Sequence, residues 1–282
     1  MVETGQESHV RNEVMVMKRI SHPFCTNLYA TYVDKRYFYI LLELSSGGEL
    51  FRIIETAPAG QLSNAAACFY ASNVVCAFEY LHSQKIIYRD LKLENLILDA
   101  YGYLKLVDFG FAKRVYGRTY TLCGTVDYLA PEIISQQGHG FEVDLWALGV
   151  LVYEMLVGYP PFEGETKGDT NETYKNILAG KFTMPIGLVT PEASNIIDGL
   201  LTVNCLDRLG CGRMRSRDVK THPWFKGLDW SQLLERRVHP PLVPNISNPL
   251  DTRNFDEYDE NESDVDEFEK PLDALDDLFK NY

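Results

Sequence analysis

The amino-acid sequence predicts an α+β fold made of two unequal lobes, and three observations support this prediction. Two β-rich runs, residues 28–33 and 37–42, flank a short polar turn, which is the pattern of an antiparallel hairpin. Helical periodicity dominates from residue 141 to about residue 220. The hairpin and a single helix precede this larger helical part, and a link between the lobes is expected at residues 44–48.

The first helix is expected over residues 6–20, because Val10, Val14 and Met17 recur at helical spacing. The His22-Pro23 pair ends it, since the residue before a proline is disfavoured in the helical conformation.

Further elements follow the two glycines of the link. Ser63 is expected to cap a long helix that runs through Leu81. The helix is followed by short apolar runs that predict small strands, at residues 86–88, 96–98 and 104–107. The proline-rich stretch 239–244 cannot be helical, and it leads into an acidic tail.

Composition places the 282-residue chain among soluble globular proteins, with 45% apolar and 24% charged residues. No apolar run approaches the roughly 20 residues that span a bilayer, and no secretory signal is expected at the N-terminus. Six scattered cysteines without a C-x-x-C pair are interpreted as reduced thiols of a cytoplasmic protein.

The net charge of −13 is concentrated in the tail, because residues 251–282 hold 13 acidic and 3 basic side chains. The rest of the chain is therefore nearly neutral. This balance argues against nucleic-acid binding.

Three short motifs occur in a fixed order: Tyr88-Arg89-Asp90-Leu91-Lys92-Leu93-Glu94-Asn95, then Asp108-Phe109-Gly110, then Ala130-Pro131-Glu132. Each motif alone is weak, but their order and strand-loop-strand context are difficult to obtain by chance. With these motifs the chain resembles the protein kinase superfamily over nearly its whole length. The resemblance implies a bilobal protein-kinase-like fold and ATP-dependent transfer of phosphate to serine or threonine.

The residue types suit this chemistry, since phosphoryl transfer requires positioned charge more than covalent participation. Asp90 would accept the proton of the substrate hydroxyl, and Asn95 and Asp108 would hold Mg²⁺. Lys92 would neutralise charge on the transferred phosphoryl group. Taken singly, each could be a loop-capping or solvated side chain, whereas the group favours catalysis.

A finer resemblance is to the AGC group, in the branch of the cyclic-AMP- and cyclic-GMP-dependent kinases. It depends on Tyr88, where most kinases have histidine, on the loop 117–125, and on the tail motif Phe255-Asp256-Glu257-Tyr258. The resemblance implies phosphorylation of Thr121, whose phosphate would pair with Arg89 and Lys113. The alternative is that Thr121 is an ordinary exposed threonine.

The same resemblance implies substrates with basic residues before the phosphoacceptor. Glu49, Glu94 and Glu154 match the carboxylates that receive those residues, and carboxylates pair well with the arginine fork. Taken alone, Glu49 could be a first-turn helix acid and Glu154 a core residue. Leu122 and Leu129 would line an apolar pocket for the residue after the phosphoacceptor.

Further positions follow from the resemblance alone. ATP contacts are implied at Glu43, Ser45, Glu49, Ile97, Asp108, Phe255 and Tyr258. Structural roles are implied for a hydrophobic column of Met17, Leu28, Phe109 and Tyr88, for Asp144 as the anchor of the catalytic loop, and for a Glu132–Arg208 ion pair. The aromatic end of the chain, Phe279-Lys280-Asn281-Tyr282, resembles a motif that docks on the small lobe, and the acidic run before it is expected to be solvated. A cyclic-nucleotide-binding regulatory module or subunit is the implied partner.

The kinase pattern also requires a glycine-rich loop and a strand lysine, and neither is found. Glu13 matches the helix glutamate, and the 12 residues before it are too few for three strands. The expected organisation is therefore a partial small lobe over residues 1–44, a large lobe over 45–226 and an acidic tail over 227–282. Two hypotheses stay open: a shortened or incompletely predicted form of an active kinase, and a non-catalytic kinase-like protein that binds peptides or regulators. Either way, the chain as given is expected to have little kinase activity.

Overall fold

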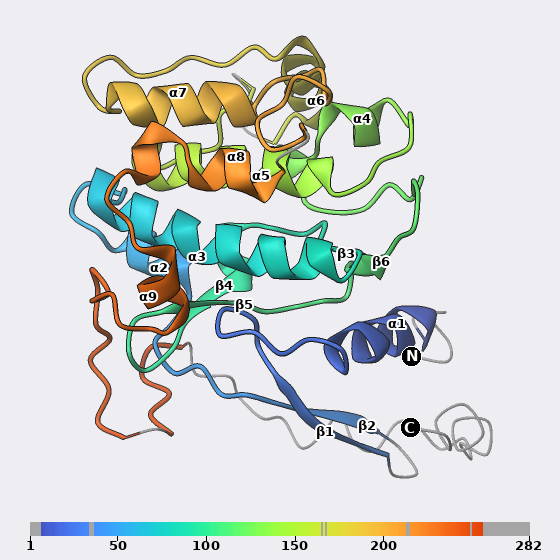
Figure 1. The fold of residues 1–282 in the computed structure, drawn as a ribbon, viewed down its shortest axis with the longest axis vertical. Helices are drawn as coiled ribbons and strands as arrows, with labels where there is room; N and C mark the ends of the chain where they lie inside the picture. Colours follow the sequence, from blue (N-terminus) through green and yellow to red (C-terminus); the bar gives the residue numbers. More distant parts are fainter. Residues whose placement is uncertain are drawn as a thin grey trace.

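A helix and a two-stranded hairpin form the N-terminal part of the protein (Figure 1). The computed structural model describes residues 7–33, 37–164, 166, 168–212, 215–248 and 250–255. Helix α1 spans Glu7–Met17, and strands β1 (Leu28–Val33) and β2 (Phe38–Leu42) pair antiparallel, with Val33 opposite Phe38. The predicted turn at residues 34–36 lies outside the described residues.

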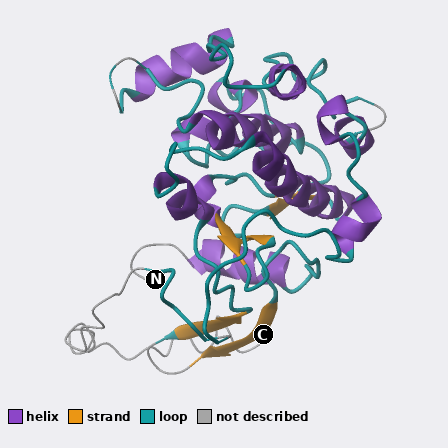
Figure 2. Ribbon diagram, turned by 90° about the vertical axis from the view of Figure 1, so that its left-hand side faces the viewer, coloured by secondary structure: helices purple, strands orange, loops and turns teal. Residues whose placement is uncertain are grey.

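Backbone hydrogen bonds join this N-terminal part to the rest of the molecule. The Leu106 amide donates to the carbonyl oxygen of Phe24 at 3.0 Å, and the Thr26 amide donates to the carbonyl oxygen of Leu106 at 2.9 Å. Phe24 is fully buried, and the Asn12 side chain on α1 donates to the carbonyl oxygen of Ala112 at 2.6 Å. The joint is therefore made by the segment after α1, whereas the hairpin itself lies apart from most of the helices (Figure 2).

Two helices and two small sheets follow the link. Helix α2 spans Leu50–Glu55 and α3 spans Asn64–Ser83, where the Ser63 hydroxyl accepts a hydrogen bond from the Ala66 amide as the sequence predicts. The small antiparallel sheets pair β3 (Ile86–Ile87) with β6 (Lys113–Arg114), and β4 (Leu96–Leu98) with β5 (Leu104–Leu106). The loops that carry the sequence motifs leave from these sheets.

Helix α5 is the centre of the helical body. It spans Glu142–Val157, is buried along most of its length and contacts both α3 and α7. Gly149 allows this close packing, because a Cβ there would lie only 2.8 Å from the Cβ of Leu200 on α7. The remaining helices are α4 (Pro131–Ile134), α6 (Thr170–Ala179), α7 (Pro191–Leu200), α8 (Ser216–Lys220) and α9 (Trp230–Leu234), with 3₁₀ turns at Leu93–Asn95, Val126–Tyr128 and Pro223–Phe225.

This arrangement confirms the predicted α+β fold with a small strand-containing part and a larger helical part. The prediction for the proline-rich stretch is also confirmed, since residues 239–244 are not helical. Within the described part of the chain, no helix has the length and apolar character needed to cross a membrane.

Candidate active site

The loop between β3 and β4 brings three of the predicted catalytic side chains together. The Asn95 side-chain amide donates to the carbonyl oxygen of Asp90 at 2.8 Å and to its Oδ2 at 2.9 Å. Lys92 Nζ lies 3.3 Å from the same Oδ2, and the Thr125 hydroxyl donates to Oδ1 at 3.2 Å. Asp90 is only 3% exposed, so these contacts hold its carboxylate in one orientation.

Asp144 on α5 anchors this loop through its backbone. Its Oδ2 accepts from the Tyr88 amide at 3.0 Å and its Oδ1 from the Arg89 amide at 2.8 Å, while His82 Nε2 lies 2.7 Å from Oδ2. Arg89 has a left-handed backbone with φ 69°, a conformation that a non-glycine residue adopts only when its surroundings impose it. The buried helix carboxylate therefore fixes the loop one residue before Asp90.

Asp108 and Asn95 fit the requirements of a magnesium site. The Val107 amide donates to the carbonyl oxygen of Asn95 at 3.0 Å, which ties the Asp108 segment to the catalytic loop. Both donor bonds of Asn95 go to Asp90, so its Oδ1 is left to bind a cation, and Asp108 Oδ1 accepts from the Gly110 amide at 3.0 Å. Mg²⁺ is commonly held by one or two such protein oxygens together with substrate phosphates. Within the described residues no cluster of three or more His, Cys, Asp or Glu side chains forms a metal site.

Glu13 on α1 faces the same segment. A Cβ added at Gly110 would lie 4.0 Å from Glu13 Oε2. Burial and the negative charge of Asp108 raise the pKa of Glu13, and a backbone hydrogen bond at Phe109 acts in the opposite direction. A lysine paired with this carboxylate would instead lower its pKa.

The predicted phosphorylation site lies on an exposed loop beside two cations. Thr121 is exposed, and Lys113 Nζ donates to the hydroxyl of Thr119 at 3.1 Å. Arg89 donates from Nε to the carbonyl oxygen of Phe111 at 2.8 Å, and one of its terminal nitrogens is buried without a hydrogen-bond partner. A buried guanidinium nitrogen without an acceptor is a position where an anion would be stabilised.

Acidic side chains gather where the sequence predicts a site for basic residues. Burial, with contributions from Glu94, Asp127 and Glu163, raises the pKa of Glu154 to about 7. The Tyr128 hydroxyl donates to Glu154, and burial together with Glu163 raises the pKa of Asp127. The carboxylates therefore interact with one another, and a cation between them would relieve their repulsion.

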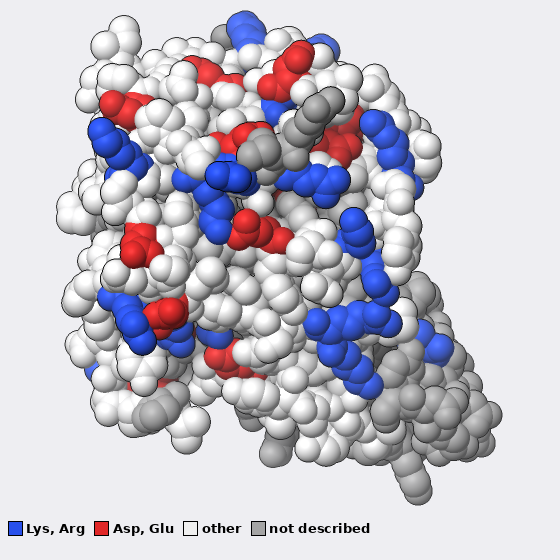
Figure 3. Space-filling view, in the orientation of Figure 1, with Lys and Arg blue, Asp and Glu red and all other residues white. Residues whose placement is uncertain are grey.

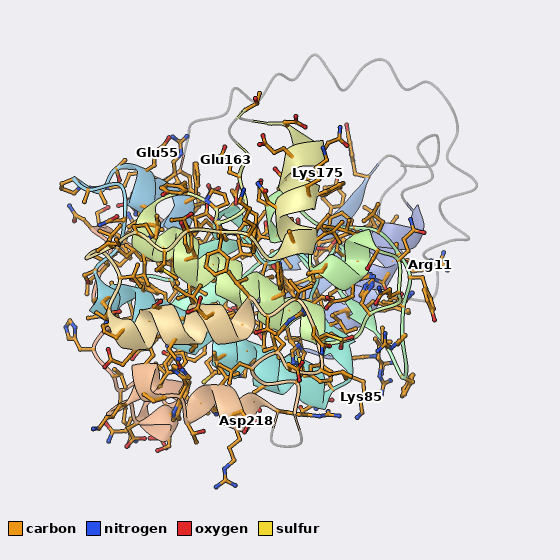
Figure 4. The ribbon with its side chains drawn as sticks, turned by 90° about the horizontal axis from the view of Figure 1, so that it is seen from above. Arg11, Glu55, Lys85, Glu163, Lys175 and Asp218 are labelled. Atoms are coloured by element: carbon orange, nitrogen blue, oxygen red, sulfur yellow. The ribbon has the colours of Figure 1, made fainter. Side chains whose placement is uncertain are left out.

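Sequence reasoning missed some members of this site. Asp127 and Glu163 interact electrostatically with Glu154, and Thr125 and Tyr128 bond to predicted site residues. Their position between the predicted phosphosite and the Ala-Pro-Glu motif is a signal that could have identified Asp127, Thr125 and Tyr128. Glu163 is brought to the cluster by the fold, and it lies on the same side of the molecule as Glu55 (Figure 4).

The residues predicted to contact ATP lie along the link and β4. Glu43 Oε1 lies 2.6 Å from Lys105 Nζ and Oε2 accepts from the Asn27 side chain at 2.7 Å, so this side chain is engaged in the protein. Lys105 and the Asn27 bonds lower the pKa of Glu43 against a burial effect that raises it. Ser45 is buried with a hydroxyl that has no hydrogen-bond partner.

The other predicted ATP contacts occupy the same region. Glu49 and Ile97 form an isolated antiparallel bridge, and both side chains are half-buried. Phe255 is half-buried, and its neighbour Asn254 donates from its side chain to the carbonyl oxygen of Ser46 at 3.0 Å. Tyr258 and the aromatic motif at residues 279–282 lie outside the described residues.

The two leucines predicted to line a substrate pocket differ in exposure. Leu122 is 55% exposed, whereas Leu129 is 4% exposed and its side chain lies against Gly124. The predicted hydrophobic column is present in part as a direct ring contact, because Tyr88 and Phe109 meet edge to face at 5.4 Å. The predicted Glu132–Arg208 pair is buried and bidentate, with nitrogen–oxygen distances of 2.7 and 2.9 Å.

Comparison of the sequence with known proteins identifies the family to which it is similar. Residues 2–225 match the protein kinase domain family. The chain is 44% identical over 283 residues to the human cAMP-dependent protein kinase catalytic subunit PRKX, with 100% of this chain and 76% of the relative covered. It is 46% identical over 264 residues to mouse PRKX, covering 94% of this chain and 73% of the relative.

A relative from a third organism gives a similar match. The cAMP-dependent protein kinase catalytic subunit of Dictyostelium discoideum is 46% identical over 262 residues, covering 93% of this chain and 40% of that protein. The chain thus spans between 40% and 76% of the length of the relatives compared.

Proposed function

The chain belongs to the protein kinase domain family, and we propose that it is a serine/threonine kinase of the cAMP-dependent type that phosphorylates hydroxyl groups preceded by arginines. The observation that carries this proposal is the Asp90 carboxylate, held by Asn95, Lys92 and Thr125 in a loop anchored by Asp144. Positioning of this kind is the main protein contribution to phosphoryl transfer.

Each side chain of the loop has a separate task. Asp90 accepts the proton of the attacking hydroxyl, and Lys92 stabilises the negative charge on the phosphoryl group in transit. Asn95 Oδ1 and the Asp108 carboxylate would hold Mg²⁺, which when bound neutralises the phosphates of ATP. The ATP base would lie along the link, near Glu43, Ser45, Ile97 and Phe255.

The acidic cluster supports the proposed substrate preference. Burial and the neighbouring negative charges of Glu94 and Glu163 raise the pKa values of Glu154 and Asp127, so an arginine placed among these carboxylates would replace repulsion by paired charge. Glu49, the N-cap residue of α2, is proposed as a further acceptor for a substrate arginine. Leu122 offers an exposed apolar surface to the residue that follows the phosphoacceptor.

Regulation is proposed at Thr121 and through a partner. A phosphate on Thr121 would find the unpartnered nitrogen of Arg89 and the amine of Lys113, ordering the loop through charge-assisted hydrogen bonds. A cyclic-nucleotide-binding subunit or module is the proposed partner, and six unpaired cysteines support a cytoplasmic location. The proposed organisation divides the chain at residues 44–45 and 226–227.

We expect the 282-residue chain on its own to be a weak enzyme. The sequence contains no G-x-G-x-x-G motif, and the raised pKa of Glu13 is the opposite of what a paired lysine would cause. Bound ATP would therefore lose positional and electrostatic contributions together. This observation favours, as a second candidate, a non-catalytic role in which the acidic cluster binds basic peptides without turnover.

The test compares peptide phosphorylation with peptide binding. The purified chain is given Mg²⁺, ATP and a serine peptide with two preceding arginines, alongside the same peptide with alanines in their place. The kinase proposal expects slow phosphorylation that Asp90→Asn abolishes and that the alanine peptide does not support. Binding of the arginine peptide with no Asp90-dependent turnover would favour the non-catalytic candidate, and equal use of both peptides would contradict the proposed specificity.

A further inference from the structure

A cavity of about 240 Å³ lies between α3, α5 and α8. The short helix α8 contacts α3, and Figure 4 shows Lys85 and Asp218 on the side opposite to Glu55 and Glu163. The interior of the cavity is apolar and consists of buried side chains: Val75, Phe78, Leu145, Leu148 and Val219.

Aromatic rings form one wall of this cavity. The rings of Phe78 and His82 stack with their centroids 5.4 Å apart and an interplanar angle of 18°, and Phe141 lies 5.5 Å from His82. The guanidinium of Arg215 lies over the Phe141 ring at 4.9 Å from its centroid. A flat aromatic ligand would find π surfaces here in the offset or edge-on geometries that rings prefer.

The mouth of the cavity is positively charged. Lys85 and Arg215 both belong to its lining and are exposed. The lining also contains the carboxylate of Glu79, which is already bonded to neighbouring protein groups. Glu79 Oε2 lies 2.5 Å from Lys220 Nζ, and its Oε1 accepts from the Ser216 hydroxyl at 3.1 Å. In Figure 3, blue Lys and Arg side chains lie over α8 and near the end of α3, with red Asp and Glu side chains between them. An anion is therefore the complementary charge for a group at this mouth.

We propose that this cavity binds a small aromatic carboxylate, with one or two rings in the apolar interior and the carboxylate between Lys85 and Arg215. The volume of the cavity suits such a ligand. An apolar cavity of about 150 Å³ accepts benzene, and the present cavity is larger, at about 240 Å³. This inference does not rest on the proposed kinase activity, since no residue of the phosphoryl-transfer site lines the cavity.

The bound ligand acts on the catalytic loop through His82. The ring of His82 lines the cavity on one side, and its Nε2 lies 2.7 Å from Oδ2 of Asp144. Asp144 in turn accepts from the amides of Tyr88 and Arg89, at 3.0 and 2.8 Å. A ligand that packs against the His82 ring restrains the Asp144 carboxylate and hence the backbone of the loop that carries Asp90.

The binding test uses 2-naphthoate as the probe and the full 282-residue chain. Calorimetric titration is expected to show saturable binding of one equivalent, with the neutral 2-naphthamide at least about fivefold weaker. Lys85→Gln and Arg215→Gln are each expected to weaken naphthoate binding by about fivefold. The matched control is Arg217→Gln, an exposed cation on α8 that is outside the lining, which should change the affinity less than about twofold.

The coupling to the catalytic loop has its own readout. Amide hydrogen exchange at Tyr88 and Arg89 is expected to slow by at least about threefold when naphthoate is bound, relative to amides of α6. His82→Ala should abolish this protection while leaving charge-dependent binding detectable. Absence of saturable binding, or equal affinity for naphthoate and naphthamide, overturns the proposed site. Binding without selective slowing at Tyr88 and Arg89 overturns the link to the catalytic loop.

Discussion

The helical body and the N-terminal hairpin differ in how their apolar side chains are covered. Of the 16 residues of α5, 14 are buried, among them the anchor Asp144. None of the residues in β1 and β2 is buried, and Tyr29 and Tyr32 are 65% and 59% exposed. Both regions are rich in apolar and aromatic residues, so composition does not explain the difference.

The same comparison divides the candidate site between the two regions. Asp90, Asn95 and Asp144 all belong to the body, and their geometry depends on buried hydrogen bonds within it. Glu13 comes from the N-terminal part, where its carboxylate is near Asp108 and its pKa is raised. Among the described residues β1 and β2 pair only with each other, so the outer edge of each strand is open to pairing with another chain.

The largest effects are expected for fully buried side chains of the helical body, and the first of these is the ion pair that α4 shares with the loop after α7. Arg208 is 1% exposed, makes a bidentate pair with Glu132 and lies over the ring of Trp146. Arg208→Ala leaves a buried carboxylate without its partner and should lower the free energy of unfolding by about 3–5 kcal/mol. Urea unfolding followed by tryptophan fluorescence measures this change.

An exposed arginine is the control for this prediction. Arg237 pairs with Glu235 at 2.9 Å, with side-chain exposures of 72% and 54%. Arg237→Ala should cost less than about 1 kcal/mol. Equal costs for the two variants would contradict the expectation that burial makes the Glu132–Arg208 pair more important for stability than an exposed pair.

Much of the body could be predicted from local patterns. The hydroxyl of Ser63 and the apolar residues after it predict a capped helix. The structure contains both the cap and the helix. The positions of Asp90 and Asn95 follow from a motif in which five residues of chain bring the two side chains into contact. Both the helix cap and the Asp90–Asn95 contact join residues that are close in the sequence, so the sequence alone could predict them.

Other features depend on packing between distant segments and could not be predicted. Glu163 joins Glu154 and Asp127 only because the loop after α5 folds back over the 3₁₀ turn at residues 126–128. The cavity beside His82 requires the relative placement of α3, α5 and α8, which no spacing in the sequence encodes. Through-space electrostatics and cavities arise from tertiary structure.

The stability of the body is expected to depend on pH through Glu154. Glu154 has a pKa of about 7 in the folded protein, above the 4.5 that is its usual value. The folded state therefore binds this proton more tightly, so the free energy of unfolding falls as pH rises from 4.5 to about 7 and then levels. The fall amounts to at most about 3.4 kcal/mol.

Glu154→Gln should remove this component of the pH profile. Its stability relative to the parent chain is expected to increase between pH 4.5 and 8, as measured by urea unfolding at several pH values. Glu235→Gln, an exposed carboxylate, serves as the control and should leave the slope unchanged. Parallel profiles for the parent and Glu154→Gln would show that the acidic cluster is hydrated rather than buried.

A smaller effect is expected at the anchor of the catalytic loop. Asp144→Asn keeps the size of the side chain but replaces one acceptor by an amide donor that faces the Tyr88 or Arg89 amide. The cost should be about 1–3 kcal/mol, with faster hydrogen exchange at those two amides. Glu55→Gln, on the exposed face of α2, should change neither quantity. Unchanged exchange in Asp144→Asn would mean that the loop is held by other contacts.

The smallest effect is expected for the hairpin. Replacing a tyrosine by alanine in the hairpin can be compared with the same replacement in the helical body. Tyr32 is 59% exposed on β1, so Tyr32→Ala removes little buried surface and should change the free energy of unfolding by less than about 0.5 kcal/mol. Tyr153 on α5 is 1% exposed, and its hydroxyl donates to the carbonyl oxygen of Thr183, so Tyr153→Ala should cost about 3–5 kcal/mol. Urea unfolding of both variants measures the contrast. A cost above about 1 kcal/mol for Tyr32→Ala would mean that another segment or another copy of the chain covers the hairpin in solution, because an uncovered tyrosine has no buried contacts to lose.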